Sequence, residues 1–446
     1  MNRTRNPLST NLLPLLVALG AGLSGMAQAQ SLVDLYAAAK SYDATYLSAK
    51  AQADANIAKG DQAKAGILPS VGLGASASQT NQTSSLASLD GRNYNTQSAA
   101  LSATQPLYRP GNWATYEQGK KQAEISQAQL QAAEQDLIVR VSQAYFDVLA
   151  ATDNLTFVRS QKAATAEQLA SAKRNFQVGT STVVDTRDAQ ARYDLVVAQE
   201  LAAENDLRVK SVALDQLVGR SGTAPKPLRA PVKLSDVQPA DVEPWVQQSE
   251  ANNPVIKQAQ IALDVAKLET EKAQDGHKPT LDLVGSYSAA NNNGSSTSST
   301  SYTANVASVG LNFSLPLFAG YSIQNRVKET LALEEKARND LDAAKRSVAQ
   351  GTRTAFLGLQ SGLSQVKAYE AAEISTQSAL DANKLGYQVG VKINIDVLNA
   401  QSQLYSTKAT LAKARYDVLV GGLKLRQATG LLNEDDLQPI NTQLAP

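Results

Sequence analysis

The segments FQVGTSTVVDTRDAQ, residues 176–190, and YQVGVKINIDVLNAQ, residues 387–401, decide the fold because they are two versions of one motif. Each places an aromatic residue before Gln-Val-Gly and an aspartate six residues after the glycine, Asp185 in the first and Asp396 in the second. Other segments repeat at an offset of 209 to 211 residues: Pro69 and Pro279, residues 106–108 and 316–318, Tyr145 and Phe356, Gly219 and Gly430. The chain is therefore two copies of one supersecondary unit, which predicts a pseudo-symmetric architecture and not a scaffold with one unique catalytic cleft.

The composition favours helices that pack through small side chains. The chain has 446 residues, a formal net charge of +1 and no cysteine. Disulfides, thiolate metal sites and a lipidated N-terminal cysteine are thereby excluded, and the charge gives no reason to expect a nucleic-acid partner. Only 5% of the residues are aromatic, fewer than a conventional globular core would carry.

The first 29 residues have the pattern of a secretory signal peptide. A basic start is followed by a short apolar run over residues 12–23 and by Ala27-Gln28-Ala29, a cleavage site of the A-x-A type. An N-terminal membrane anchor is the alternative, but the run is short and is interrupted by Pro14 and two glycines. We therefore expect the mature protein to be exported.

Each repeat begins with a helical pattern, over residues 32 to about 64 in the first and 242 to about 273 in the second. Each then contains two segments with the period of a β-strand. Residues 70–78 alternate between small polar and apolar side chains, and Val309, Leu311 and Phe313 share one face of a second segment. Strands of roughly ten residues with one apolar face suit a tilted crossing of an outer membrane. A solvent-exposed pair of hairpins on a soluble protein is the alternative.

Long helical patterns follow the strands. No proline occurs between Pro110 and Pro225 or between Pro316 and Pro439, and apolar residues recur at spacings of three and four. A helix over residues 112–178 would be ~100 Å long, which predicts coiled-coil-like rods that end at the motif glycine and then return. The expected fold class is thus an α+β membrane protein, internally duplicated, with four membrane strands per chain and long antiparallel helical hairpins.

The expected divisions are a signal peptide at 1–29, a first repeat at 30–229, a second repeat at 230–434 and a tail at 435–446. The first repeat holds a β-hairpin at 67–107 and a helical hairpin at 112–219, and the second holds the equivalents at 279–317 and 322–430. Four membrane strands leave two unpaired edges that lipid cannot satisfy, so several copies must share one barrel. Two copies would give a filled barrel of eight strands and three would give twelve strands and a passage, and the residues leave this choice open.

Several segments resemble the TolC family of outer-membrane efflux and type I secretion channels: NFQVGTSTVVD at 175–185, GYQVGVKINIDVLNAQSQLY at 386–405, QPLYRPGNW at 105–113, SLPLF at 314–318, LAKARYDVLVGGLKLRQATG at 411–430 and LLNEDDLQ at 431–438. The resemblance covers essentially all of the mature chain. It implies a homotrimer in the outer membrane of a Gram-negative bacterium, with a shared trimeric β-barrel and a helical tunnel across the periplasm. It also implies a passive duct for drugs or polypeptides, without catalytic residues, cofactor or metal.

The resemblance further implies partners and a gate at the far end of the tunnel. The tip would meet a periplasmic adaptor and an inner-membrane transporter of the RND, ABC or MFS class, and which transporter and cargo apply stays open. The adaptor would contact the two turns, Val178-Gly179-Thr180 and Val389-Gly390-Val391. The family's latch between neighbouring helices falls on Tyr387, Lys392 and Asp185, and its acidic lumen ring on Asp396 and Asn399.

Two departures from the family pattern affect this gate. Lys392 stands where arginine is typical and loses bidentate pairing, and Asn399 removes one carboxylate per chain. Carboxylates converging on an axis should titrate above their free values and favour cations. Alternatively, Asp185 and Asp396 only begin the returning helices, where a carboxylate is favourable, and Tyr387 only packs, since its counterpart is Phe176.

Four aromatic residues lie where strands turn into helices: Tyr108, Trp113, Phe318 and Tyr321. They fit an aromatic belt at the membrane interface, with ordinary packing as the alternative. No Ser-His-Asp arrangement and no phosphate-cradling glycine loop is present, and His277 is the only histidine, so an enzyme is not expected. The competing class is a structural protein, either a trimeric coiled-coil stalk or a soluble periplasmic adaptor.

Overall fold

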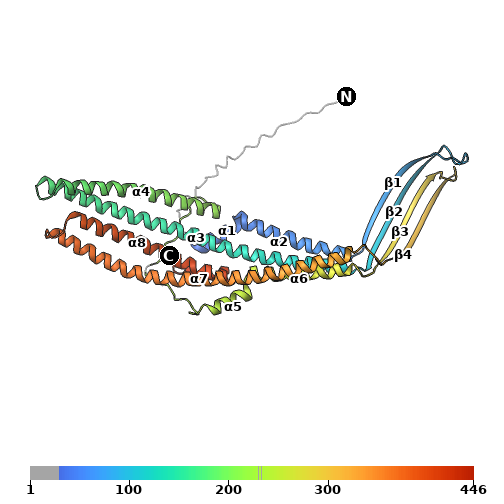
Figure 1. The fold of residues 1–446 in the computed structure, drawn as a ribbon. Coiled ribbons are helices and arrows are strands. Elements are labelled where there is room, and N and C mark those ends of the chain that lie inside the picture. Colours follow the sequence, from blue (N-terminus) through green and yellow to red (C-terminus); the bar gives the residue numbers. More distant parts are fainter. Residues whose placement is uncertain (1–29, 230, 233, 446) are drawn as a thin grey trace, which may run out of the picture.

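The computed structural model describes residues 30–229, 231–232 and 234–445, so the expected signal peptide lies outside the described residues. The chain is an elongated rod of helices, with a β-sheet at one end and, at the other, the two turns where the long helices reverse direction (Figure 1). In chain order its helices and strands are α1 (Leu32–Tyr42), α2 (Ala44–Ala63), η1 (Lys64–Ile67), β1 (Ser70–Gln82), β2 (Arg92–Tyr108), α3 (Pro110–Gln177), α4 (Val183–Val218), α5 (Glu243–Asn252), α6 (Pro254–Asp275), β3 (Thr280–Asn293), β4 (Ser301–Ser314), α7 (Ser322–Gln388), α8 (Asn394–Ala428), η2 (Glu434–Leu437) and α9 (Gln438–Asn441).

The four strands form one antiparallel sheet in the order β1-β2-β3-β4. Cross-strand neighbours such as Leu73, Leu101 and Tyr287 are in register on one exposed apolar face, as the period of two predicts. The opposite face carries small polar residues. The second hairpin is shorter than the expected 279–317. Its strand pairing ends where Ser314, the last residue of β4, faces Thr280, the first residue of β3.

The long helices are the rods that the sequence predicts. α3 has 68 residues and α7 has 67, and each is followed by a returning helix of about half that length, α4 or α8. α3 begins at Pro110 and not at residue 112, because proline fits the first helical position, which needs no N–H partner. The expected helices near 32–64 and 242–273 are each broken, since Asp43 caps α2 and Asn253 caps α6 just before Pro254.

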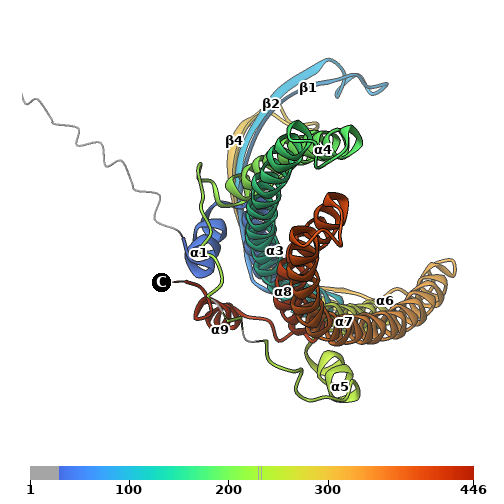
Figure 2. The same cartoon turned by 90° about the vertical axis from the view of Figure 1, so that its left-hand side faces the viewer.

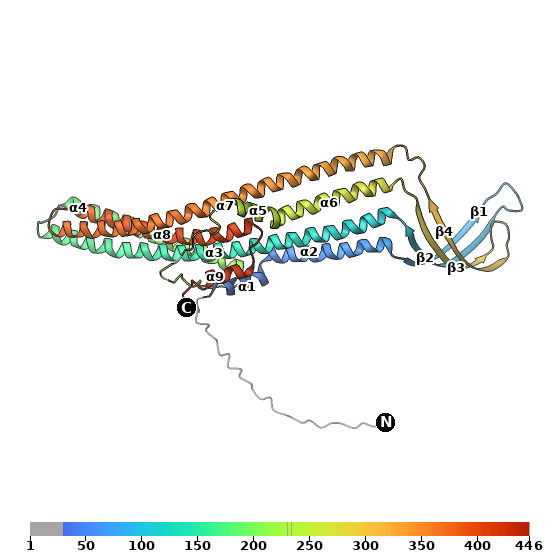
Figure 3. The same ribbon diagram turned by 90° about the horizontal axis from the view of Figure 1, so that it is seen from below.

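The helices lie side by side as a curved layer (Figure 2). Next to the sheet the order across the layer is α2, α3, α6 and α7, and towards the turns it is α4, α3, α8 and α7. Figure 3 shows both halves of this layer, with α1, α5 and α9 packed beside its middle. α4 and α7 therefore form the two borders of the layer near the turns, as β1 and β4 form the borders of the sheet.

The main hydrophobic core lies at this middle level. Tyr145 and Phe146 of α3 are almost fully buried, and the ring of Phe146 stacks on Tyr416 of α8 with centroids 5.5 Å apart. The Tyr145 hydroxyl donates to the carbonyl oxygen of Lys226 at 2.8 Å, which ties the linker between the repeats to α3. Burial of the ring raises the pKa of the Tyr145 hydroxyl well above its usual value.

The predicted fold of the chain is confirmed: it is duplicated, has four antiparallel strands and continues into long helical hairpins. The division into two repeats, a linker and a tail at the stated residues stays a prediction. Within the described residues, no helix is both long and apolar enough to span a membrane.

Candidate functional site

The first turn, between α3 and α4, is closed by a glycine and by a helix cap. Gly179 has a φ of +78°, and the N–H of Thr180 donates to the carbonyl oxygen of Asn175 at 2.8 Å, which ends α3. Asp185 then caps α4: its Oδ2 accepts from the Ser181 hydroxyl at 2.8 Å and from the Thr182 N–H at 3.0 Å. The Thr182 hydroxyl accepts in return from the Asp185 N–H at 3.2 Å, so the two residues form a capping box.

The second turn, between α7 and α8, has the same backbone path without that cap. Gly390 also has a φ of +78°, and the N–H of Val391 donates to the carbonyl oxygen of Gly386 at 2.8 Å. The residue before α8 is Ile393, whose side chain cannot accept a hydrogen bond. Lys392 lies against Gly386, where a Cβ atom would come within 2.7 Å of the lysine Cγ, so the glycine makes room for the lysine stem.

The candidate gate residues lie at these turns but are not bonded to one another as a single group within one described chain. Lys392 Nζ lies 3.6 Å from Asp396 Oδ2 one helical turn later, while Asp185 bonds within its own turn. The Tyr387 hydroxyl accepts from Asn175 Nδ2 at 3.0 Å, which joins α7 to α3 across the tip. Asn399 is exposed on α8.

The electrostatics of Asp185 follow from its hydrogen bonds in the first turn. The backbone N–H of Thr182, followed by the hydroxyls of Ser181 and Thr182, holds the pKa of the Asp185 carboxyl below its usual value, and partial burial opposes this only weakly. Three donors thus stabilise the charged form of this carboxyl, whereas the expected upward shift concerns the lumen ring and stays a prediction. Both aspartates lie in the first turn of a returning helix, so the alternative role of favouring the helix start applies to both.

The outer surface of the tip is apolar and open. Val178 is 72% exposed in the first turn, and Val389 and Val391 are 64% and 78% exposed in the second. Gly179 and Thr180 are exposed as well, and no side chain of the described residues lies within 4 Å of the position that a Cβ would take at Gly179 or Gly390. Exposed apolar side chains concentrated on two adjacent turns are typical of a docking surface.

At the other end of the rods, the four predicted belt residues are all exposed. Trp113 lies edge-on to Tyr116 with ring centroids 6.3 Å apart, and Phe318 lies edge-on to Tyr321 at 5.5 Å. Tyr108 ends β2. Between them Arg109 makes two hydrogen bonds to Asp282 of β3, one of them from Nε to Oδ1 at 2.7 Å, which binds the start of α3 to the second repeat.

Sequence reasoning missed Asn175, the partner of Tyr387. Its position corresponds to Gly386 in the second repeat, so the two turns differ there, but only the approach of the ends of α3 and α7 at the tip shows what the amide contacts. It also missed the bond of 2.6 Å from the Tyr416 hydroxyl to Asp153, which joins the two repeats near the core. Among the described residues, no cluster of three or more histidine or acidic side chains is arranged to hold a metal ion.

Comparison with known proteins gives concordant matches. The sequence model of a family described as outer membrane efflux protein matches residues 35–220 and 245–431, one segment in each repeat. The chain is 35% identical over 439 residues to outer membrane protein TolC of Vibrio cholerae, covering 97% of this chain and 98% of the relative. It is 31% identical over 386 residues to the alkaline protease secretion protein AprF of Pseudomonas aeruginosa, covering 84% of this chain and 79% of the relative. A solved structure of CusC, described as a transmembrane channel, shares the fold with a TM-score of 0.79 at 19% identity, over 90% of this chain and 92% of that one.

Proposed function

This chain belongs to the outer membrane efflux protein family, and we propose that three copies of it build one gated duct from the periplasm to the cell exterior. It is an outer-membrane channel for efflux and type I secretion, located in the outer membrane of a Gram-negative bacterium with a periplasmic helical tunnel. The two unpaired edges of the sheet are the main support for the proposal that several copies assemble. β1 and β4 each leave one edge of backbone N–H and C=O groups without a partner strand in the described chain, and lipid offers them none.

The borders of the helical layer support the same conclusion. Leu195 and Leu201 of α4 and Leu357 and Ile374 of α7 are between 58% and 71% exposed. These apolar side chains lie on the two border helices, where neighbouring copies would cover them. Three copies would supply twelve strands, which leave a passage, whereas the eight strands of two copies would be filled by side chains.

We assign the gate to the tip. In the trimer, Asp396 of three copies would form an acidic ring, and Tyr387 and Lys392 would reach acceptors such as Asp185 on neighbouring helices. The phenol of Tyr387 supports this, because its oxygen already accepts from Asn175 and its proton remains available to an acceptor. The exposed valines of both turns would receive a periplasmic adaptor, which connects the duct to an inner-membrane transporter of the RND, ABC or MFS class.

The duct is proposed to be passive, with no chemistry of its own. The relatives AprF of Pseudomonas aeruginosa and PrtF of Dickeya chrysanthemi are described as secretion proteins for proteases, which supports polypeptide export as one use of this kind of channel. The belt residues Tyr108, Trp113, Phe318 and Tyr321 are proposed to mark the periplasmic membrane interface.

The test is the ion selectivity of the purified channel in a planar bilayer. A unit charge about 4 Å from a permeating ion changes its energy by about 1 kcal/mol even in water, so Asp396→Ala should lower the ratio of cation to anion permeability by about fivefold or more. Asn399→Asp is the matched control and should raise this ratio, because it adds a carboxylate one turn away. An unchanged reversal potential in both variants would show that the ring is misassigned, and a protein that stays monomeric and makes no channel would refute the function itself.

A further inference from the structure

We propose that the cavity beside Asp153, at the middle of the rod, binds a small organic ammonium ion. The cavity has a volume of about 310 Å³ and lies mainly between α3, α8 and the linker that joins the two repeats. Asp153 of α3 and Tyr416 of α8 both line it, and the Tyr416 hydroxyl donates to Asp153 Oδ2 at 2.6 Å. The site lies within one chain, so the proposal does not depend on the number of copies in the channel.

Asp153 is a partly buried acid that lacks a cation. Within the part of the chain that the structure describes, no basic side chain forms an ion pair with its carboxylate, whose hydrogen-bond partner is the neutral Tyr416 hydroxyl. Burial raises the pKa of the Asp153 carboxyl, and the bond from Tyr416 opposes this only in part. An ionised carboxylate in such a place is costly unless it is paired, so a bound cation would stabilise its charged form.

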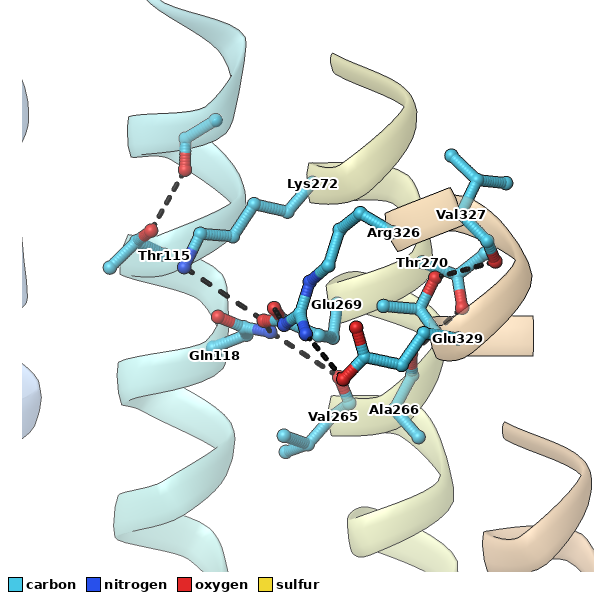
Figure 4. A network of polar contacts seen from close by, with 12 residues as sticks. Thr115, Gln118, Val265, Ala266, Glu269, Thr270, Lys272, Arg326, Val327 and Glu329 are labelled. Carbon is cyan, nitrogen blue, oxygen red and sulfur yellow. Dashed lines mark hydrogen bonds and ion pairs between the residues drawn. The ribbon is translucent and has the colours of Figure 1, made fainter. Parts of the chain in front are cut away.

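The acid at another join between the repeats shows the difference. Figure 4 shows Gln118 of α3 and Arg326 of α7 converging on Glu269 of α6. Gln118 Nε2 donates to this carboxylate at 2.8 Å and Arg326 Nη2 donates at 2.6 Å. Burial, which would raise the pKa of Glu269, is outweighed by these two donors, so the pKa lies below its usual value. Glu269 is therefore neutralised within the chain, whereas Asp153 has one neutral donor.

The other charged groups that line the cavity already face groups of opposite charge. Arg415 Nη2 lies 2.8 Å from Oε1 of Glu370 on α7, and Lys408 Nζ lies 3.9 Å from Oε1 of Glu373 on the same helix. The lining residues that the linker contributes are uncharged. The carboxylate of Asp153 is thus the charge that remains to be balanced, which favours one positive charge in the cavity.

The rest of the wall favours an organic ion over a metal ion. It is apolar and partly aromatic, formed by Phe157, Leu228, Val232, Leu411 and Ala412. A metal ion would require several oxygen ligands, and the described residues hold no group of three or more histidine or acidic side chains that could supply them. An ammonium group on a small apolar body suits both the carboxylate and the hydrocarbon wall, and the rings of Phe157 and Tyr416 attract such a cation.

Occupation of the site would strengthen the join between the two repeats. The ion would contact side chains of both α3 and α8, the two middle helices of the layer. A ligand that binds the folded chain and not the unfolded chain stabilises the fold in proportion to its concentration and affinity. The affinity should fall as the pH falls and Asp153 takes up a proton, because the carboxyl then has no charge to balance.

The test compares two probes of the same shape on the purified full-length protein in detergent. Benzylammonium carries the positive charge, and benzyl alcohol is its uncharged counterpart. A ligand-detected NMR titration at neutral pH should show benzylammonium bound about tenfold or more tightly, because a charged hydrogen bond to Asp153 is added to the same apolar contacts. This preference should shrink at acid pH, where benzylammonium keeps its charge and Asp153 becomes neutral.

Two variants assign the binding to this cavity. Asp153→Asn removes the charge and keeps an oxygen that accepts from Tyr416, so the preference for benzylammonium and its pH dependence should be lost, although Glu373 still titrates. Ala412→Leu places a larger side chain in the cavity and should weaken the binding of both probes. Asp147→Asn is the matched control: this acid lies on α3 outside the cavity, 3.3 Å from Lys210 Nζ, and its loss should leave both affinities unchanged.

The outcomes separate this site from the proposed channel. Equal affinity for the two probes, or a preference for benzylammonium that survives in Asp153→Asn, would overturn the site. A protein that Asp153→Asn destabilises but that binds no ammonium ion would overturn it too, because Asp153 would then serve only the bond to Tyr416. Channel formation and conductance in a planar bilayer are measured on the same preparation, and their loss would refute the channel without bearing on the cavity.

Discussion

Asp185 has two possible roles that one carboxylate can combine. Three hydrogen bonds hold the Asp185 carboxylate against the first turn of α4, so the position of its charge is fixed. At the second turn no such cap exists, and Lys392 holds Asp396 only by a long ion pair of 3.6 Å between an exposed lysine and a half-exposed aspartate, which contributes little. The two turns thus share a backbone path and differ in how firmly the returning helix is fixed.

This difference predicts a pH dependence confined to the first turn. The pKa of Asp185 is lower in the folded chain, so the cap stabilises α4 fully above the unfolded value of about 3.9 and is lost as the pH falls through the folded value. Thr182→Ala should cost about 1 kcal/mol, or roughly fivefold faster hydrogen exchange in the first turn of α4, and that loss should shrink at acid pH. Ile393→Ala at the uncapped α8 is the control and should not show this dependence; equal behaviour of both variants would contradict the role of the cap.

At the scale of elements, the crossing of α2 and α3 depends on two glycines. A Cβ at Gly119 would lie 2.8 Å from the Cβ of Ala63, and a Cβ at Gly60 would lie 2.8 Å from the carbonyl oxygen of Gly119. Gly119→Ala gains about 1 kcal/mol of helix propensity but should lose about 1–3 kcal/mol to overpacking, a net destabilisation. Gly422→Ala on α8 is the control: a Cβ there meets open space, so this variant should only gain stability. The midpoints of thermal unfolding measure both variants. A stabilised Gly119→Ala would show that α2 can move aside.

The elements were largely predictable because their signals are local. Alternation over residues 70–78, the absence of proline in the long helices and the glycines of the two turns each determine a structure within a few residues. The contacts between elements were not. Asn175 meets Tyr387 because the ends of α3 and α7 come together at the tip, and Asp153 meets Tyr416 because α3 packs on α8; no spacing along the chain encodes which faces of these rods meet. The breaks at Asp43 and Asn253 are local caps that the helical periodicity concealed.

For the whole molecule, the borders of the sheet and of the helical layer are the reason for proposing sister copies. One chain has four strands with two free edges and a layer of helices whose border residues are apolar and exposed. In the proposed trimer the tip closes only if three equivalent sets of contacts form together. A weak interaction in each chain is then multiplied by three, so small changes at the latch should have large effects on the closed state.

The latch can be weakened without disturbing the helices. Tyr387→Phe with Lys392→Ala removes one hydroxyl and one charge per copy, each contributing on the order of 1 kcal/mol, and leaves the ring of residue 387 packed beside Leu380 and Val397. The resting conductance in a planar bilayer should rise severalfold, and cells should admit large hydrophilic antibiotics more readily. Asn175→Ala distinguishes the contact of the Tyr387 hydroxyl within its own chain from the proposed contact with a neighbouring copy, because it removes only the first. If Asn175→Ala alone reproduces the full increase in conductance, the Tyr387 hydroxyl acts within its own chain and the latch between copies is wrong. If Asn175→Ala has a small effect and the double variant a large one, the contact that closes the tip lies between neighbouring copies.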